Sequence, residues 1–376
     1  MEFIRVEDCC EILDSQRKPV TESERVPGMY PYYGANGIQG TINQYIFDDK
    51  LVLVAEDGGH FGSKIKPIAY LVNGKCWVNN HAHVLRAKKG FLAEYICYSL
   101  MFYKIEGYIN GATRQKLTQA ALRKLIIPKR TVEYQKAIVD RLELVKCIIE
   151  KKQNIINELD LLIKSRFVEM FGDLNHNPSY PVVNLKSLII GSPSNGFFAS
   201  KELYDKNGKV NLIGVKEVVG NLYTDIYDTL KLNVDESTLK KYLIDYGDML
   251  FCRSSLVKSG IAKASIVPKS NNKSCIFECH TIKIKLNQQL CIPEFMQVQS
   301  EQTYFRNQVI KNSKTATMTT ISQQGIVDTK VLLPPLSIQQ EFTKLLSQIN
   351  KLKSDVQKSI DETQLLMDSL MQKFFG

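Results

Sequence analysis

The stretch PKRTVEYQKAIVDRLELVKCIIEKKQNIINELDLLIKSRFVEMFG, residues 128–172, decides how this chain is organised, because a second version of it occupies residues 334–376. Both copies open with a proline after an aliphatic residue, Ile127 in one and Leu333 in the other. Proline's fixed φ and missing N–H suit a chain that is entering a helix. Both copies end on Phe-Gly, and glycine is a frequent helix stop. The sequence therefore predicts one long helix that occurs twice.

Apolar residues recur in both copies at alternating spacings of four and three, and eight of the ten steps are apolar in each. A 3.5-residue period held this long predicts a helix that pairs with another helix rather than one lying on a sheet. Two unrelated amphipathic core helices remain the alternative, which the matching ends make less attractive. The predicted core of the helix pair is Ile138, Leu142, Val145, Ile149, Ile156, Leu159 and Ile163 with Phe342, Leu346, Ile349, Val356, Ile360, Met367 and Leu370.

The polar steps of this pattern fall at different places in the two copies. They are Lys152 and Arg166 in the first copy and Lys353 and Thr363 in the second. The two apolar stripes are therefore not interchangeable, which favours pairing inside one chain over pairing with another copy. An antiparallel pair would give the order domain, helix, domain, helix a circular, pseudo-two-fold arrangement with the domains at opposite ends.

The intervening segments read as two mixed α+β domains, so that the predicted boundaries are 1–126, 127–172, 173–332 and 333–376. In the first domain we expect strands in YIFDDKLVLVAEDG, IAYLV and CWVNNHAHVL, then a helix in FLAEYICYSLMFYKI and a short one before LIIP. The second domain repeats the plan: GDMLFCRSS parallels LVLVAEDGG, FECHTIKIKL parallels WVNNHAHVL, and CIPEFMQVQSEQTYFRNQV supplies the helix. The fold class is therefore α+β with two long antiparallel helices.

Composition sets outer bounds on the class of protein. A chain of 376 residues with 44% hydrophobic residues can bury two cores. There is no apolar run of 18 residues and the N-terminus is charged, so we expect a cytoplasmic protein without membrane span or signal peptide. Nine cysteines without a CxxC pair indicate reduced packing residues. The clusters Cys275–Cys279–His280 and His81–His83 lie in alternating strand-like runs, so no metal site is predicted.

The net charge of +10 is concentrated outside the repeated helices. Residues 1–126 carry +3 and residues 173–332 carry +5, whereas the two helical segments carry +2 and 0. This distribution favours a polyanionic partner held by the two domains.

Catalytic signatures are lacking in the sequence. It has no P-loop, no HExxH, no GxSxG and no glycine-rich turn with an NPPY-type motif for methyl transfer. Asp140, Glu150 and Lys152 have a loose nuclease-like spacing, but they fall inside the predicted helix, where a solvated face explains them. We therefore predict no catalytic residue, and no cofactor bound by this chain.

Polar loops at the ends of the predicted strands offer hydrogen-bonding groups for base edges and phosphates. Taken singly, each such residue is more simply an ordinary solvated loop residue, but they recur at matching places in both halves. The candidate DNA-binding residues are Tyr32, Tyr33, Asn36, Lys64, Lys66, Arg114, Gln115 and Lys116 in the first domain, and Arg253, Ser254, Ser255, Lys258, Lys311, Asn312, Lys314, Thr315 and Thr317 in the second.

The succession YPYYGANGIQGTI, LVLVAEDGG, WVNNHAHVLR and GATRQKLTQAALRKLIIP, followed by a long heptad helix, resembles the target recognition domain and spacer helix of the DNA-specificity subunits of type I restriction-modification enzymes. The second half, with GDMLFCRSS, HTIKI, TISQQGI and LLPPLSIQQEF, is similar to the other recognition domain of that family. The first helix departs from the family pattern because IPKR stands where the second has LPPL.

This resemblance implies a non-catalytic subunit that binds double-stranded DNA and docks two methyltransferase subunits, with restriction subunits added for cleavage. Each recognition domain would read one half of a split sequence, and the paired helices would fix the gap between the halves. S-adenosylmethionine would be bound by the methyltransferase, which would flip out the adenine. The alternatives are a helical adaptor with an incidental basic surface, a related DNA-methylating defence system, and a stand-alone enzyme.

Overall fold

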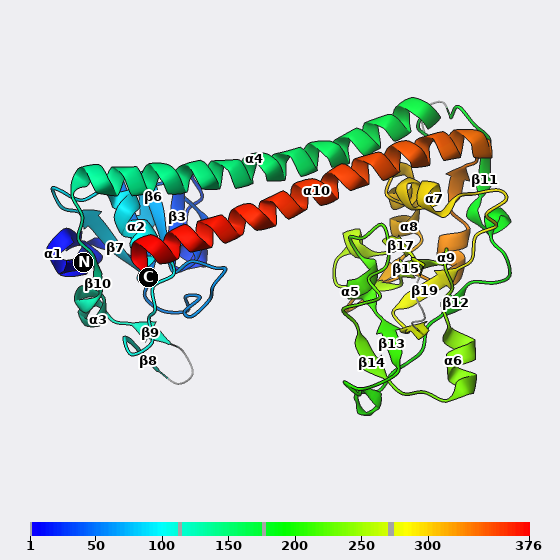
Figure 1. Cartoon of the computed structure of the whole chain (residues 1–376), viewed down its shortest axis with the longest axis horizontal. Coiled ribbons are helices and arrows are strands. Elements are labelled where there is room, and N and C mark those ends of the chain that lie inside the picture. Colours follow the sequence, from blue (N-terminus) through cyan, green and yellow to red (C-terminus); the bar gives the residue numbers. More distant parts are fainter. Residues whose placement is uncertain (1, 112–114, 175–177, 270–273) are drawn as a thin grey trace. The chain divides into compact units, whose positions relative to one another are not determined.

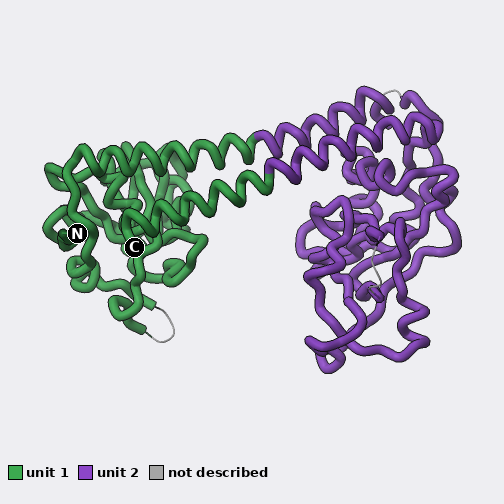
Figure 2. Tube along the Cα trace, in the orientation of Figure 1, with its two compact units in different colours: residues 1–154, 357–376 green, residues 155–356 purple. Residues whose placement is uncertain are grey.

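The computed structural model describes residues 2–111, 115–174, 178–269 and 274–376. They form two compact units: unit 1 contains residues 1–154 and 357–376, and unit 2 contains residues 155–356 (Figure 2). Each unit consists of one α+β domain together with part of each repeated helix. The domain boundaries predicted from the sequence, 126/127 and 332/333, lie just before these helices. The boundaries between the two compact units, 154/155 and 356/357, lie inside them.

The repeated segments are helices of equal length, as the repeat predicts. Helix α4 (Val132–Phe171) and helix α10 (Leu336–Phe375) each have 40 residues (Figure 1). In unit 1 the first part of α4 and the last part of α10 share a core that contains Ile138, Leu142 and Phe374. In unit 2 the last part of α4 and the first part of α10 share a core that contains Phe167 and Phe342. Within each unit, the two helices therefore run antiparallel.

Burial follows the predicted heptad stripe along most of both helices. The predicted core residues Ile138, Leu142, Val145, Phe342, Leu346, Ile349 and Ile360 are buried, and Ile149, Ile156, Leu159, Ile163, Val356, Met367 and Leu370 are half-buried. The stripe changes period after Ile163. Arg166 is exposed, and Phe167 and Phe171 occupy the inner face at spacings of four. A straight α-helix drifts relative to a 3.5-residue repeat, so spacings of four return the stripe to the core of unit 2.

The polar steps inside the stripe have partners within their own unit. In unit 1 the Lys152 ammonium donates hydrogen bonds to Ser359 and Thr363. In unit 2 the Lys353 ammonium is paired with the Asp160 carboxylate. The unequal placement of polar steps in the two copies thus corresponds to specific contacts between the helices.

Unit 1 is built on a six-stranded sheet with the strand order β2-β7-β5-β6-β3-β4. Its strands are β1 (Phe3–Arg5), β2 (Cys10–Ile12), β3 (Tyr30–Gly34), β4 (Gly37–Ile42), β5 (Phe47–Ala55), β6 (Ala69–Val78), β7 (Ala82–Ala87), β8 (Ile109–Asn110), β9 (Lys116–Leu117) and β10 (Ile126–Pro128). Its further helices are α1 (Val6–Cys9), α2 (Ala93–Met101) and α3 (Gln119–Lys124), with short 3-10 turns η1 (Asp14–Gln16) and η2 (Glu22–Glu24).

Strand β5 separates two cores because successive side chains of a strand point to opposite faces. Val52 and Val54 pack with α2 and the long helices, whereas Leu51 and Leu53 pack on the other face of the sheet. The expected split between IAYLV and CWVNNHAHVL is wrong. Strand β6 runs without a break from Ala69 to Val78, with Gly74 at φ 82°, and the chain turns only at residues 79–81 before β7 begins.

Unit 2 distributes its strands over several smaller sheets, the largest with the order β12-β19-β15-β17. Its strands are β11 (Val182–Asn184), β12 (Ser194–Asn195), β13 (Val210–Ile213), β14 (Leu230–Leu232), β15 (Met249–Cys252), β16 (Ser254–Ser255), β17 (Ala264–Ile266), β18 (Ser274–Phe277), β19 (Thr281–Ile284), β20 (Lys314–Thr315), β21 (Thr319–Thr320) and β22 (Lys330–Leu332). Its helices are α5 (Val215–Val218), α6 (Glu236–Tyr242), α7 (Pro293–Ser300), α8 (Thr303–Lys311) and α9 (Gln323–Val327), with 3-10 turns η3 (Leu185–Leu188), η4 (Lys201–Leu203) and η5 (Lys258–Gly260).

The second domain repeats the plan of the first, but with changes. The order β2-β7-β5-β6 of unit 1 matches β12-β19-β15-β17 of unit 2. The single helix expected in residues 291–309 is instead two helices, α7 and α8. Each domain closes on itself before its long helix, because β1 pairs with β10 and β11 pairs with β22.

A buried glutamine anchors each long helix to the short helix of its own domain. The Gln135 side chain accepts a hydrogen bond from Leu92 N and donates to Gly90 O and Arg130 O, at 2.9–3.0 Å. Gln339, 204 positions later, makes the same three types of bond with Ile292, Leu290 and Pro334. Both side chains are 0% exposed. The repeat therefore includes a polar anchor that the apolar pattern did not reveal.

No helix among the described residues combines the length and the apolar character needed to cross a lipid bilayer.

Candidate nucleic-acid interface

In unit 1 two of the predicted residues of the YYGANG segment, Tyr32 and Asn36, line a polar pocket of about 470 Å³. Asn36 is exposed in the turn between β3 and β4, and its Nδ2 donates to Gly58 O at 2.9 Å. Tyr32 is only 2% exposed, and its hydroxyl bonds both the N–H and the carbonyl of Val20. Tyr33 is half-buried, and burial raises the pKa of its phenol. Asn36 is thus available to a partner, whereas Tyr32 supports the pocket from inside.

The same pocket contains groups that the sequence reasoning missed. The Arg25 guanidinium lies 3.9 Å from the centre of the Tyr32 ring and donates to Gln39 O. On the opposite side, His81 Nδ1 lies 2.7 Å from Asp57 Oδ1. Amides of Gln39, Asn79 and Asn80 complete the lining. Asp57 follows β5, and Asn79, Asn80 and His81 follow β6, so for these residues the position at a strand end was the available signal. Arg25 precedes β3 and Gln39 lies within β4, and neither carried such a signal.

The other predicted groups of unit 1 are less closely gathered. Lys64 and Lys66 are exposed in the segment between β5 and β6, and Gln115 is exposed next to β9. Lys116, in β9, forms an ion pair with Glu56 at 3.0 Å. Arg114 lies outside the described residues. Lys116 is therefore a predicted cation that an ion pair holds in a defined place.

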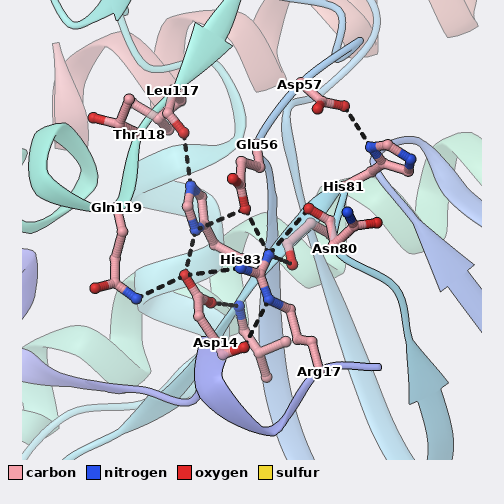
Figure 3. A network of polar contacts seen from close by, with 12 residues as sticks. Asp14, Arg17, Glu56, Asp57, Asn80, His81, His83, Leu117, Thr118 and Gln119 are labelled. Carbon is pink, nitrogen blue, oxygen red and sulfur yellow. Dashed lines mark hydrogen bonds and ion pairs between the residues drawn. The ribbon is translucent and has the colours of Figure 1, made fainter. Parts of the chain in front are cut away.

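Glu56, the partner of Lys116, belongs to a polar network at the end of β5 (Figure 3). Arg17 donates to Glu56 Oε2 at 2.6 Å and to Ala82 O at 2.7 Å. His83 lies between Asp14 and the carbonyl of Leu117, at 2.6 and 2.8 Å. Burial alone would raise the pKa of Asp14 and of Glu56, but hydrogen bonds from His83 and Arg17 respectively outweigh it, and both pKa values are lowered. Both carboxylates are therefore held ionised.

Among the described residues, Asp14, Glu56 and His83 are close enough together to be considered as ligands of a metal ion. The surroundings do not suit a metal, because the Arg17 guanidinium contacts both carboxylates and both ring nitrogens of His83 face hydrogen-bond acceptors. Cys275, Cys279 and His280, for which no metal site was predicted, are not among the clusters close enough to hold a metal in the described part of the chain. Burial raises the pKa of the Cys279 thiol, which disfavours the thiolate that a metal would need.

In unit 2 the structure brings two predicted groups together that are about sixty residues apart in sequence. Strands β16, β21 and β20 form one small sheet, so Ser254 and Ser255 lie on the same sheet as Lys314 and Thr315. Thr315 and Lys314 are exposed, and the Thr315 hydroxyl is 3.0 Å from that of Thr319. Ser254 is 8% exposed, and its backbone pairs with Thr320 in this sheet. The remaining predicted residues, Lys258, Lys311, Asn312 and Thr317, are exposed, although Asn312 Nδ2 is engaged with Gly325 O.

Arg253 directly precedes β16, and it lines a second polar pocket of about 600 Å³. One of its guanidinium nitrogens donates to Cys279 O at 3.1 Å. The lining also includes Asn195, Ser322, Gln323 and Gln324, none of which was predicted from the sequence. Arginine and glutamine side chains at such a surface are suited to guanine and adenine edges.

Comparison with known proteins shows which proteins this chain resembles. Residues 1–161 match the family model described as "Type I restriction modification DNA specificity domain". Over these residues, the chain is similar to the type I restriction-modification specificity family. A Haemophilus influenzae protein named as a putative type I restriction enzyme specificity subunit is 35% identical over 143 residues, which cover 38% of this chain and 37% of that protein. The EcoKI specificity subunit of Escherichia coli is 22% identical over 388 residues, covering 92% of this chain and 81% of that protein.

Solved structures of the specificity family share the fold over the full length of the chain. The specificity subunit from M. genitalium has a TM-score of 0.55 at 14% identity and covers 100% of this chain and 96% of that one. A chain from a structure concerned with complex assembly of the type I restriction-modification system has a TM-score of 0.58 at 15% identity, with 100% and 97% coverage. At this identity the likeness concerns the fold alone.

Proposed function

We propose that this chain is the DNA-specificity subunit of a type I restriction-modification complex. The observation that carries the proposal is the duplication itself. Two domains that share an order of four strands each present a polar pocket, and each is followed by one of two matching 40-residue helices. One domain would read each half of a split DNA sequence, and the helices would keep the gap between the halves constant.

The proposal assigns the chemistry to partners. Two methyltransferase subunits would bind the chain and carry S-adenosylmethionine, and restriction subunits would join for cleavage, all in the cytoplasm. The polar pockets support a reading role because amide, guanidinium and imidazole groups line them. Such groups discriminate bases by hydrogen bonding rather than by bond-making.

The decisive experiment is selection from a random duplex pool by the chain assembled with its cognate methyltransferase. Enrichment of two short sequences separated by an unread gap of fixed length is expected. An adaptor with an incidental basic surface would retain DNA without enrichment, and its retention would fall with salt as phosphate contacts do.

Two further measurements distinguish the specificity subunit from a stand-alone enzyme and from a related defence system. The purified chain alone should neither transfer methyl groups nor cleave DNA, and either activity would point to a stand-alone enzyme. If the complex methylates the selected sequence but no nuclease subunit joins it, a related methylating defence system is the better description.

A further inference from the structure

His83 is a fully buried imidazole whose two nitrogens both face hydrogen-bond acceptors (Figure 3). Nε2 lies 2.8 Å from Leu117 O, and a carbonyl oxygen can only accept, so Nε2 carries a hydrogen. Nδ1 lies 2.6 Å from Asp14 Oδ2. The Asp14 carboxylate also accepts hydrogen bonds from Val84 N and Gln119 Nε2, as an ionised carboxylate does. Nδ1 is thus in position to donate as well, and a ring that donates from both nitrogens is an imidazolium.

The imidazolium joins the sheet to the segment that contains Lys116. Leu117 O accepts from His83, and Leu117 N donates to Glu56 O at 2.8 Å. The next residue, Thr118, caps α3 through its hydroxyl. Residues 116–119 are thereby held at the end of β5, where Lys116 reaches Glu56.

The charged groups around the ring come from three elements. Asp14 and Arg17 come from η1 and the residue after it, Glu56 follows β5, and Lys116 lies in β9. Glu56 Oε2 is 3.7 Å from His83 Nδ1, and Asp57, the next residue along, is paired with His81. With Asp14 and Glu56 ionised, this environment stabilises a cationic ring.

Unit 2 provides a natural control at the equivalent position. His83 is opposite Val54 in the β5–β7 ladder, and Ile282 is opposite Phe251 in the β15–β19 ladder. Each lies one step before the end of its central strand, so Ile282 occupies the position of His83. Unit 2 therefore has no titrating side chain there.

We propose that His83 is a positioning residue that works as an imidazolium. Its two N–H groups lock residues 116–119 onto the end of β5, and DNA reading by unit 1 depends on the second ring proton. This inference rests on the proposed function.

The protonation itself can be measured without DNA. In nitrogen-15 NMR of the full chain labelled at its five histidines, both ring nitrogens of His83 should be protonated at about pH 7, with the signal assigned by its loss in His83→Gln. A neutral ring with one bare nitrogen would overturn the proposal.

The Asp14→Asn variant, assembled with the methyltransferase, tests whether DNA reading by unit 1 depends on the second ring proton of His83. The new amide N–H can donate to Nδ1, so a neutral ring keeps both bonds and the requirement for the second proton disappears. With the parent, binding to the unit 1 half-site should weaken about tenfold as the pH is raised until the ring is neutral, the effect of one charge-assisted hydrogen bond. With Asp14→Asn the change should be less than about twofold, and the unit 2 half-site should show no difference between the two proteins.

If Asp14→Asn does not fold, His83→Gln serves the same purpose, because its uncharged amide can donate to Leu117 O and does not titrate. Identical pH profiles in parent and variant, or equal changes at both half-sites, would refute the positioning role. If no sequence is enriched at all, the proposed function fails, while the NMR result still decides the state of the ring.

Discussion

The Lys152 ammonium of α4 lies 2.7 Å from the Thr363 hydroxyl of α10, and both residues occupy polar steps of an otherwise apolar stripe. The other two N–H groups of Lys152 donate to Ser359 Oγ at 2.7 Å and Ser359 O at 3.0 Å. All three N–H groups of Lys152 find these acceptors only when Ser359 and Thr363 of α10 lie next to it. The contact therefore specifies both the partner and the register of the helix pair within unit 1.

Replacing both residues by leucine should remove this specificity without weakening the apolar stripe. For Lys152→Leu with Thr363→Leu we expect unchanged or higher helix stability but increased self-association, since either helix could then pair with one from another chain. Sedimentation velocity at matched concentration measures this, with Lys151→Leu on the exposed face as control. A double variant that associates no more than the control would argue against a specifying role.

Removing the buried Gln135 side chain should destabilise unit 1. Gln135→Ala removes the partner of Leu92 N and of two carbonyl groups in a part-buried site, at a cost of about 2–3 kcal/mol. Trp77, the single tryptophan, is buried in unit 1 and reports its unfolding in urea by fluorescence. Lys136→Ala, at an exposed neighbour, should change stability by less than about 0.5 kcal/mol. An equally small change for Gln135→Ala would mean that the anchor contributes nothing.

Acid should weaken unit 1 through Glu56. Its pKa is lowered in the folded chain, because the bonds from Arg17 and Lys116 outweigh burial. A carboxylate of this kind adds stability above its unfolded pKa, and that stability is lost as the pH falls through the lower, folded value. The urea midpoint reported by Trp77 should therefore fall below about pH 4.5, and fall less in Glu56→Gln. Equal acid sensitivity in both proteins would exclude Glu56 as the cause.

Lengthening both helices by one heptad should widen the unread gap in the selected DNA. Seven residues keep the apolar stripe in phase and add about 10 Å at ~1.5 Å per residue. The gap should then grow by about three base pairs. To test this, seven residues are inserted at both 154/155 and 356/357, and the complex is used to select DNA from a random pool. As a control, an insertion in one helix alone should disrupt the pairing of the helices. A gap that stays the same would refute the spacing role of the helices.

Exchange of the first domain should change one half of the recognised sequence and leave the other half unaltered. Strand β1 pairs with β10, so a graft of residues 1–128 from another specificity subunit transfers this closure intact. A graft that stops at residue 125 would split the pair and is expected to fold less well. Methylation mapping measures the outcome, and changes in both halves would count against independent reading.

The sequence by itself determined the features that repeat or that follow a period. The displacement of 204 positions and the 3.5-residue stripe were sufficient to locate two equal helices, because burying an apolar stripe along a helix needs only local periodicity. The apolar run LVLVA, which ends at an Asp-Gly turn, also placed β5, and its parallel GDMLFCRSS placed β15. The break expected within β6 was wrong because hydrogen bonding to β5 along its length, Gly74 included, holds the strand together.

Only the tertiary structure decided which polar residues meet. Asp14, Glu56, His83 and Leu117 come from four separate segments, and nothing in their local sequence signals that they share one buried site. The same holds for Lys152 with Thr363, which are hydrogen-bonded, and for Arg253 and Gln323, which line one pocket. Pairing of a buried polar group is enforced by the cost of leaving it without a partner, and that cost depends on which segments the fold brings together.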